Sequence, residues 1–236
     1  MTGKLWGIGV GPGDPELLTL KAHRLIGAAP VVAYPAPDTG DSLARAIAAD
    51  AIQSGIIEIP MIVPMRVERF PAQEVYAEAA EAIANHLEDG QDVAVLCEGD
   101  PFFFGSFMYL FARLAGRFPV EIVPGVSSLG ATAAALGRPL VARNDVLTVL
   151  PGTLPDEELS PRIEAADAVA IMKVGRHLPR LRALIEQMGL TKSAGYVERA
   201  TMDAQHVAPL ADAPATAPYF SMILISKGDD PWLTPS

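Results

Sequence analysis

The feature that most constrains the fold of this chain is an alternation of short apolar segments with amphipathic helical segments. Residues 4–10 form an apolar run that ends in glycines, and Asp-Pro-Glu at 14–16 then supplies a cap, a first-turn proline and an acidic residue, which together favour a helix start. An amphipathic pattern continues to Gly27, and residues 30–35 are typical of the next strand. This order predicts a β-α-β unit within a parallel sheet.

The alternation continues further along the chain. Apolar residues recur at four-residue spacing from Val75 to Leu87 and fall on one helical face, and Gly90 ends that helix. Val93–Cys97 is then apolar throughout, as is usual for a strand buried on both faces of a parallel sheet.

The pattern changes after about residue 118, where strands follow one another with fewer clear helices between them. The expected strands are Val120–Val123, 146–150, Ala168–Met172, 194–197 and 219–226. One late helix carries an apolar stripe over residues 178–188 and ends at Gly189, a favourable left-handed cap. We therefore expect an α/β protein with a mainly parallel N-terminal domain, residues 1–117, and a mixed-sheet C-terminal domain, residues 118–236.

Composition excludes several classes of protein. Of the 236 residues, 50% are hydrophobic and 19% charged, which argues for buried cores, while the longest uncharged stretches contain too much Pro, Gly, Ser and Thr for a membrane span. The net charge of −10 argues against a nucleic-acid surface. The single cysteine, Cys97, and four scattered histidines have no metal-ligand spacing, so no metal is expected. The lack of a secretory signal predicts a cytoplasmic protein.

Four glycines lie within residues 7–13, directly after the first strand. Glycine lets a strand turn sharply while its backbone approaches a ligand, which suggests a dinucleotide site. However, the spacing is Gly-x-Gly-x-Gly-Pro, and Pro12 removes a backbone donor that would bind a pyrophosphate. A strand-to-helix turn is the structural alternative; it explains Asp14 and Pro15 but not the glycines.

A second loop, Glu-Gly-Asp-Pro-Phe-Phe-Phe-Gly at 98–105, follows the apolar strand Val93–Cys97, the position at which open α/β sheets bind ligands. Asp100 can bind a ribose or an ammonium group, and exposed backbone amides can receive a carboxylate. The alternative is a simple turn, and core packing is the favoured interpretation of Phe102 and Phe104.

A third segment, residues 123–132, has the pattern of a strand, a turn and an alanine-rich helix. Ser127 and Ser128 stand at the start of that helix. Helix capping and ligand contact explain these two hydroxyls equally well.

Taken together and in this order, these segments resemble the precorrin and uroporphyrinogen methyltransferases, a family whose fold differs from that of the common Rossmann-type methyltransferases. The resemblance covers nearly the whole chain. It is carried by residues 9–15, by Leu-Leu-Thr-Leu-Lys-Ala at 17–22, and by residues 98–105, 123–128 and 170–173.

The resemblance implies a homodimer of two-domain chains, with S-adenosylmethionine bound in the cleft between the domains and S-adenosylhomocysteine as a product. It assigns these cofactor contacts: Pro12, Gly99, Asp100, Phe103, Ser127, Ser128, Met172 and Ala200. It also makes the first loop mainly a wall of the substrate cleft.

Two segments indicate which members of the family are most similar. Uroporphyrinogen enzymes have Tyr-Asp-x-Leu where this chain has Ala-Tyr-Pro at 33–35, so their acid-base Asp is absent. The Ala-Tyr-Pro turn and residues 59–65 look like the members that methylate precorrin-2 at C20, which implies precorrin-3A as product and a role in cobalamin biosynthesis. The alternatives are cobalt-precorrin-2 or another ring position as substrate and, from a different class, a dinucleotide-binding oxidoreductase.

Methyl transfer from a sulfonium needs positioning and exclusion of water rather than a nucleophilic side chain. The catalytic residues are unknown; the acid-base candidates are Tyr34, Asp38, Glu98 and Glu198, and the sequence does not choose among them. The carboxylates of the tetrapyrrole would need guanidinium partners, for which the candidates are Arg66, Arg69, Arg138, Arg143 and Arg176. Each of these residues also has an ordinary structural or surface interpretation.

Overall fold

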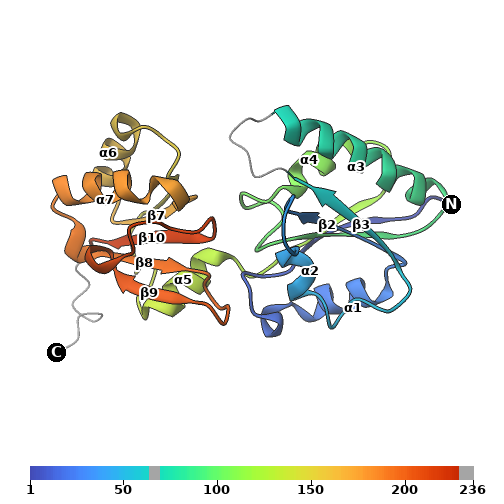
Figure 1. Cartoon of the computed structure of the whole chain (residues 1–236), viewed down its shortest axis with the longest axis horizontal. Helices are drawn as coiled ribbons and strands as arrows, with labels where there is room; N and C mark the ends of the chain where they lie inside the picture. Colours follow the sequence, from blue (N-terminus) through green and yellow to red (C-terminus); the bar gives the residue numbers. More distant parts are fainter. Residues whose placement is uncertain (64–69, 229–236) are drawn as a thin grey trace. The chain divides into compact units, whose positions relative to one another are not determined.

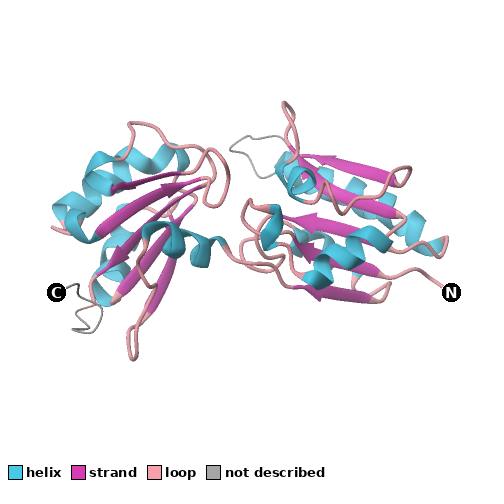
Figure 2. Ribbon diagram, turned by 90° about the horizontal axis from the view of Figure 1, so that it is seen from below, coloured by secondary structure: helices cyan, strands magenta, loops and turns pink. Residues whose placement is uncertain are grey.

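Two five-stranded sheets organise the residues that the computed structural model describes, 1–63 and 70–228, one in each of the units Met1–Ser127 and Ser128–Ser236. The first sheet is parallel, as the common direction of its arrows in Figure 2 shows, and has the order β3-β2-β4-β1-β5. Its strands are β1 (Leu5–Gly9), β2 (Val31–Ala36), β3 (Ile57–Ile62), β4 (Val93–Cys97) and β5 (Val120–Val123).

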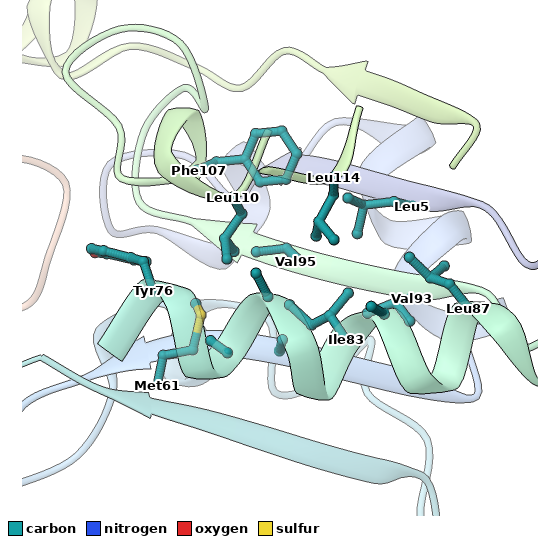
Figure 3. Close-up of a cluster of buried hydrophobic side chains, with 14 of the residues drawn as sticks. Leu5, Met61, Tyr76, Ile83, Leu87, Val93, Val95, Phe107, Leu110 and Leu114 are labelled. Carbon is teal, nitrogen blue, oxygen red and sulfur yellow. The ribbon is translucent and has the colours of Figure 1, made fainter. Parts of the chain in front are cut away.

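Helices cover both faces of the first sheet (Figure 1). They are α1 (Leu20–Ala28) and α2 (Leu43–Ile47) on one face, and α3 (Phe70–Glu88) and α4 (Phe107–Leu114) on the other. Figure 3 shows Ile83 of α3 and Leu110 of α4 packed with Val95 of β4. Every residue of β4 is buried, as its apolar sequence predicts.

The first helix differs from its prediction. Asp14 caps only a short 3₁₀ turn, η1 (Pro15–Leu17), by accepting the Glu16 N–H at 2.8 Å. The backbone is then extended at Leu18, and α1 starts afresh with Thr19 as its cap. The single predicted helix is therefore two elements, because two N-caps compete within six residues.

The second sheet has the order β6-β7-β10-β8-β9, of which Figure 1 labels β7, β10, β8 and β9. The sheet is mixed, with β6 and β7 parallel and the other pairs antiparallel. Its strands are β6 (Leu147–Pro151), β7 (Ala168–Met172), β8 (Ala194–Glu198), β9 (His206–Pro209) and β10 (Ser221–Ser226). One face packs against α6 (Asp156–Ala165) and α7 (Leu178–Gln187), and the other against α5 (Ser128–Leu136). The short 3₁₀ turns are η2 (Gly175–His177), η3 (Thr191–Ser193) and η4 (Leu210–Asp212).

The boundary between the two compact units lies at 127/128, ten residues after the domain boundary expected at 117/118. Val120–Val123, predicted to belong to the second domain, is β5 and pairs with β1 in the first sheet. A short apolar strand carries no local mark of the sheet that it joins, so only its hydrogen-bonding partner could place it.

Neither described range, 1–63 nor 70–228, contains a helix with both the length and the apolar character needed to cross a bilayer.

Glu58 on the edge strand β3 links that strand to β2 and α2. Arg45 donates from Nε to Glu58 Oε2 at 2.7 Å and from Nη2 to Oε1 at 2.9 Å, while the Tyr34 hydroxyl donates to Oε2 at 2.8 Å. The hydrogen bonds from Arg45 hold the pKa of the Glu58 carboxyl below its ordinary value. The ionised carboxylate therefore stabilises this corner of the sheet.

We expect Glu58→Gln to lower the free energy of unfolding by about 1 kcal/mol at pH 7, since the ion pair is partly exposed. Because the folded pKa is lowered, the contribution is present above the ordinary glutamate pKa of about 4.3 and is lost as the pH falls through the folded value. Urea denaturation of both proteins at pH 7 and at acid pH checks this. The exposed Glu78→Gln is the control, and a difference that persists unchanged into acid would contradict the assignment.

Candidate functional site

The loops that follow β1 and β4 leave the carboxyl edge of the first sheet in opposite directions. The two strands are parallel neighbours from Leu5↔Val93 to Gly9↔Cys97. From β1 the chain passes through α1 to β2, beyond β4, whereas from β4 it passes through α4 to β5, beyond β1. Open α/β sheets bind ligands at such switch points.

Backbone groups of three loops meet at this edge. The Gly99 N–H donates to the Gly11 carbonyl at 2.7 Å, and the Gly11 N–H donates back at 3.3 Å. A Cβ added at Gly9 would lie 2.5 Å from the Gly99 oxygen, and one added at Gly125 would lie 2.0 Å from the same atom. The loops after β1, β4 and β5 can therefore touch only because these positions lack a side chain.

Packing also explains much of the glycine run at 7–13. A Cβ at Gly7 would lie 2.3 Å from the Phe107 ring of α4, while Gly11 has a φ of +83°. The Val10 N–H donates to the Cys97 carbonyl at 2.9 Å, so this donor and that of Gly11 are already used. Because Pro12 has no N–H, the first loop is poorly equipped to bind a pyrophosphate, which weakens the dinucleotide alternative.

Asp100 joins the second and third loops through its carboxylate. Oδ1 accepts the Phe102 N–H at 2.9 Å within its own loop, and Oδ2 accepts the Gly125 N–H at 3.1 Å from the loop after β5. The Asp100 side chain thus links the loop after β4 to the loop after β5.

The three phenylalanines after Asp100 do not all pack in the core. Phe102 and Phe104 are 48% and 41% exposed, so the core interpretation of these two residues is wrong. The loop turns too tightly to bury them: a Cβ at Gly105 would lie 2.5 Å from the Pro101 carbonyl, and Phe104 has a φ of +55°. Phe103 is half-buried, with its ring edge-on to that of Phe104 at 5.2 Å between centroids.

The structure brings most of the predicted cofactor contacts of the first unit to one edge. Gly99, Asp100 and Phe103 follow β4, Pro12 follows β1, and Ser127 follows β5. Ser128 begins α5 and so belongs to the second unit.

The remaining predicted contacts lie at one edge of the second sheet. Because β10 is antiparallel to both β7 and β8, those two strands end at the same edge. Met172 ends β7 and packs its half-buried side chain against the α5 face. Ala200 lies two residues beyond β8.

Backbone strain is concentrated at this second edge. Lys173, Arg199 and Thr201 have φ values of 56°, 50° and 70°, a region that non-glycine residues seldom enter. Such strain persists only where the surrounding structure enforces it, and it gathers at functional sites. No sequence signal marks it, since none of the three is glycine or asparagine.

The acid-base candidates differ in their surroundings. Tyr34 is bound to Glu58, Asp38 is exposed, and Glu198 accepts the hydroxyl of a buried tyrosine. Burial raises the pKa of the Glu98 carboxyl, an effect that its own N–H and that of Ala44 partly offset.

The candidate substrate arginines are dispersed. Arg138 donates to the Ser193 carbonyl at 3.4 Å, Arg143 has a φ of +46°, and Arg176 lies in η2. Arg66 and Arg69 lie outside the described residues. Among residues 1–63 and 70–228, no group of three or more His, Cys, Asp or Glu side chains is arranged to hold a metal ion.

A hollow of about 390 Å³ on the second unit lies just beyond the end of β6. It is lined by Thr153, Leu154, Pro155, Asp156, Glu157, His177 and Arg180. Its Arg180 is paired with Asp156, and none of the predicted cofactor residues lines it.

Residues 4–214 match the family described as Tetrapyrrole (Corrin/Porphyrin) Methylases. A protein of Sinorhizobium sp. named precorrin-2 C(20)-methyltransferase is 43% identical over 97% of each chain. One of Salmonella typhimurium named cobalt-precorrin-2 C(20)-methyltransferase is 32% identical and covers 96% of this chain and 98% of its own. The cobalamin biosynthesis protein CobIJ of Mycobacterium tuberculosis is 44% identical over 99% of this chain, which spans only 51% of that longer protein.

Solved structures have the same fold. A uroporphyrin-III C-methyl transferase from Thermus thermophilus, complexed with S-adenyl homocysteine, is 25% identical, with a TM-score of 0.68 over 95% of this chain and 98% of its own. A cobalt precorrin-4 methyltransferase, CbiF, has a TM-score of 0.73 over 98% and 96% of the two chains at 24% identity. The predicted fold class is confirmed.

Proposed function

The chain belongs to the tetrapyrrole (corrin/porphyrin) methylases, and from this premise we propose that it transfers a methyl group from S-adenosylmethionine to C20 of precorrin-2 in cobalamin biosynthesis. The observation that carries the proposal is the Sinorhizobium relative, whose name states this activity and whose length this chain matches almost fully. Precorrin-3A and S-adenosylhomocysteine are then the products.

The residues at the two sheet edges fit such a cofactor. We assign it to Pro12, Gly99, Asp100, Phe103, Ser127, Ser128, Met172 and Ala200. Within the described chain, the backbone N–H groups of Asp100 and Ala200 donate to no protein acceptor, although both residues are half-buried. Donors of this kind are suited to a polar ligand, because a half-buried N–H left without an acceptor is unfavourable.

S-adenosylmethionine, when bound, supplies an electrophilic methyl group on a sulfonium. The residues of the chain have three tasks: to hold the nucleophilic C20 in line with that methyl group, to exclude water, and to accept the proton that C20 loses. Glu98 is our candidate for the last task, since burial raises the pKa of its carboxyl above the ordinary value.

The second candidate substrate is cobalt-precorrin-2, which the name of the Salmonella relative favours. Methylation of another ring position remains within the reach of the same fold. A dinucleotide-dependent oxidoreductase is disfavoured because the first loop has few free donors.

We also propose that the enzyme acts in the cytoplasm as a homodimer, as its resemblance to the family suggests. Sedimentation analysis would reveal a monomer if the dimer is wrong.

The decisive experiment incubates the protein with methyl-labelled S-adenosylmethionine and either precorrin-2 or cobalt-precorrin-2, then locates the label by NMR. We expect label at C20 of precorrin-2, and no label at C20 would overturn the proposal. Calorimetry with S-adenosylhomocysteine and NADH separates the enzyme classes, since tight NADH binding with no response to S-adenosylhomocysteine would favour an oxidoreductase.

A further inference from the structure

A buried tyrosine and a nearly buried glutamate form a hydrogen-bonded pair at the end of β8. Tyr196 is fully buried, and its hydroxyl donates to Glu198 Oε2 at 2.5 Å. The two side chains lie on the same face of the strand because they are two residues apart. The Glu198 side chain is 13% exposed, and its Oε1 accepts Arg199 Nη1 at 3.1 Å.

The pair stands directly before the strained turn. Arg199 and Thr201 both have positive φ, and Ala200 lies between them. The Arg199 N–H donates to the Phe220 carbonyl at 2.8 Å, and the Thr201 N–H donates to Gln205 Oε1 at 2.7 Å. These bonds hold the two strained residues, while the Ala200 N–H is left without a protein acceptor in the described chain.

The same network reaches two further loops at this edge. Ser221, opposite Glu198 in the ladder, donates from Oγ to the Pro218 carbonyl at 2.7 Å and accepts the Gly175 N–H at 3.2 Å. Burial and the neighbouring Glu198 raise the pKa of Tyr196, so its hydroxyl remains a donor at neutral pH.

The structural alternative is that Glu198 serves only as the hydrogen-bond acceptor that the buried Tyr196 hydroxyl needs. A phenylalanine would fill the same space in the core without needing a partner. The tyrosine hydroxyl instead fixes one oxygen of Glu198 and leaves the other for Arg199, the first strained residue of the turn.

We propose that Glu198, oriented by Tyr196, is a positioning residue that sets the Arg199–Thr201 turn and thereby presents the Ala200 backbone to S-adenosylmethionine. This inference rests on the proposed function. Neither side chain reacts; both act through the turn.

The test measures the binding of S-adenosylhomocysteine to Tyr196→Phe, Glu198→Gln and Glu198→Ala by calorimetry, with the melting temperature of each variant recorded. We expect Kd to rise about tenfold in Glu198→Ala, the effect of losing a charge-assisted hydrogen bond, and less in Glu198→Gln, whose amide oxygen can still accept the tyrosine hydroxyl. Tyr196→Phe and Glu198→Ala should be non-additive when combined, since each removes the same contact between the tyrosine hydroxyl and the carboxylate. Glu186→Gln, an exposed carboxylate on α7, should bind as the parent does.

Kinetics separate positioning from loss of fold. A positioning role raises the KM for S-adenosylmethionine while kcat at saturation changes little, whereas partial unfolding lowers the binding stoichiometry. Unchanged Kd and KM in folded Glu198→Gln and Tyr196→Phe would overturn the inference even if Glu198→Ala fails to fold. Normal binding by the parent without methylation at C20 would overturn only the proposed reaction, and no binding by the parent would overturn both.

Discussion

An Asp100→Ala variant is expected to bind S-adenosylhomocysteine at least about tenfold more weakly than the parent, because the change removes the acceptor of two backbone N–H groups. Those groups belong to Phe102 and Gly125, on two different loops. Without the carboxylate, the loops after β4 and β5 lose the side-chain contact that holds them together.

Asp100→Asn refines this prediction. The amide retains one acceptor oxygen but turns an NH₂ group toward the second backbone donor, so we expect an intermediate Kd. Calorimetry gives the three dissociation constants, and the exposed Asp89→Ala in the same unit is the matched control. Equal affinity in the parent and in a folded Asp100→Ala variant would contradict the role of Asp100.

Gly125→Ala should be strongly disruptive in the first unit. The added Cβ would lie 2.0 Å from the Gly99 oxygen and 2.8 Å from the Gly9 Cα, and these backbone atoms cannot move aside as a flexible side chain can. We expect the free energy of unfolding to fall by about 2–4 kcal/mol and cofactor affinity to fall with it.

Urea denaturation followed by tryptophan fluorescence, with calorimetry on the folded fraction, measures both effects. Gly116→Ala is the control, because a Cβ there meets no atom within 4 Å and its φ is not positive. That change should stay within about 0.5 kcal/mol of the parent. If Gly125→Ala behaves like Gly116→Ala, the contact between the loops is not needed for stability.

The coupling of the first two loops alters one expectation from the sequence. The family resemblance implies that the first loop is mainly a wall of the substrate cleft, with Pro12 as its cofactor contact. Gly11 and Gly99 exchange backbone hydrogen bonds, so a change at Gly11 is expected to disturb the cofactor loop as well. Sequence alone cannot find this contact, since the two glycines are far apart along the chain.

Local patterns predicted what depends on neighbouring residues. The apolar run Val93–Cys97 is β4, the spacing from Val75 to Leu87 is one face of α3, and Gly90, with a φ of +80°, follows that helix. The family match and the Sinorhizobium relative confirm the family resemblance. The sequence could indicate it because it too rests on short motifs in a fixed order.

Patterns failed where two local signals compete or where a turn is unusual. Asp14 and Thr19 each cap a separate element, so one predicted helix became two. Phe102 and Phe104 are exposed because the turn after β4 is too tight to bury them.

By itself, the sequence determined the alternation of strands and helices, the fold class and the three loops that carry the candidate site, since period and turn chemistry act over a few residues. Only the tertiary structure decided that β5 joins the first sheet, that Asp100 joins two loops, and that Arg199 and Thr201 are held under strain beside Ala200. The physical reason is that strand pairing, close backbone approach and enforced positive φ depend on residues distant in the chain, whose contacts leave no local pattern.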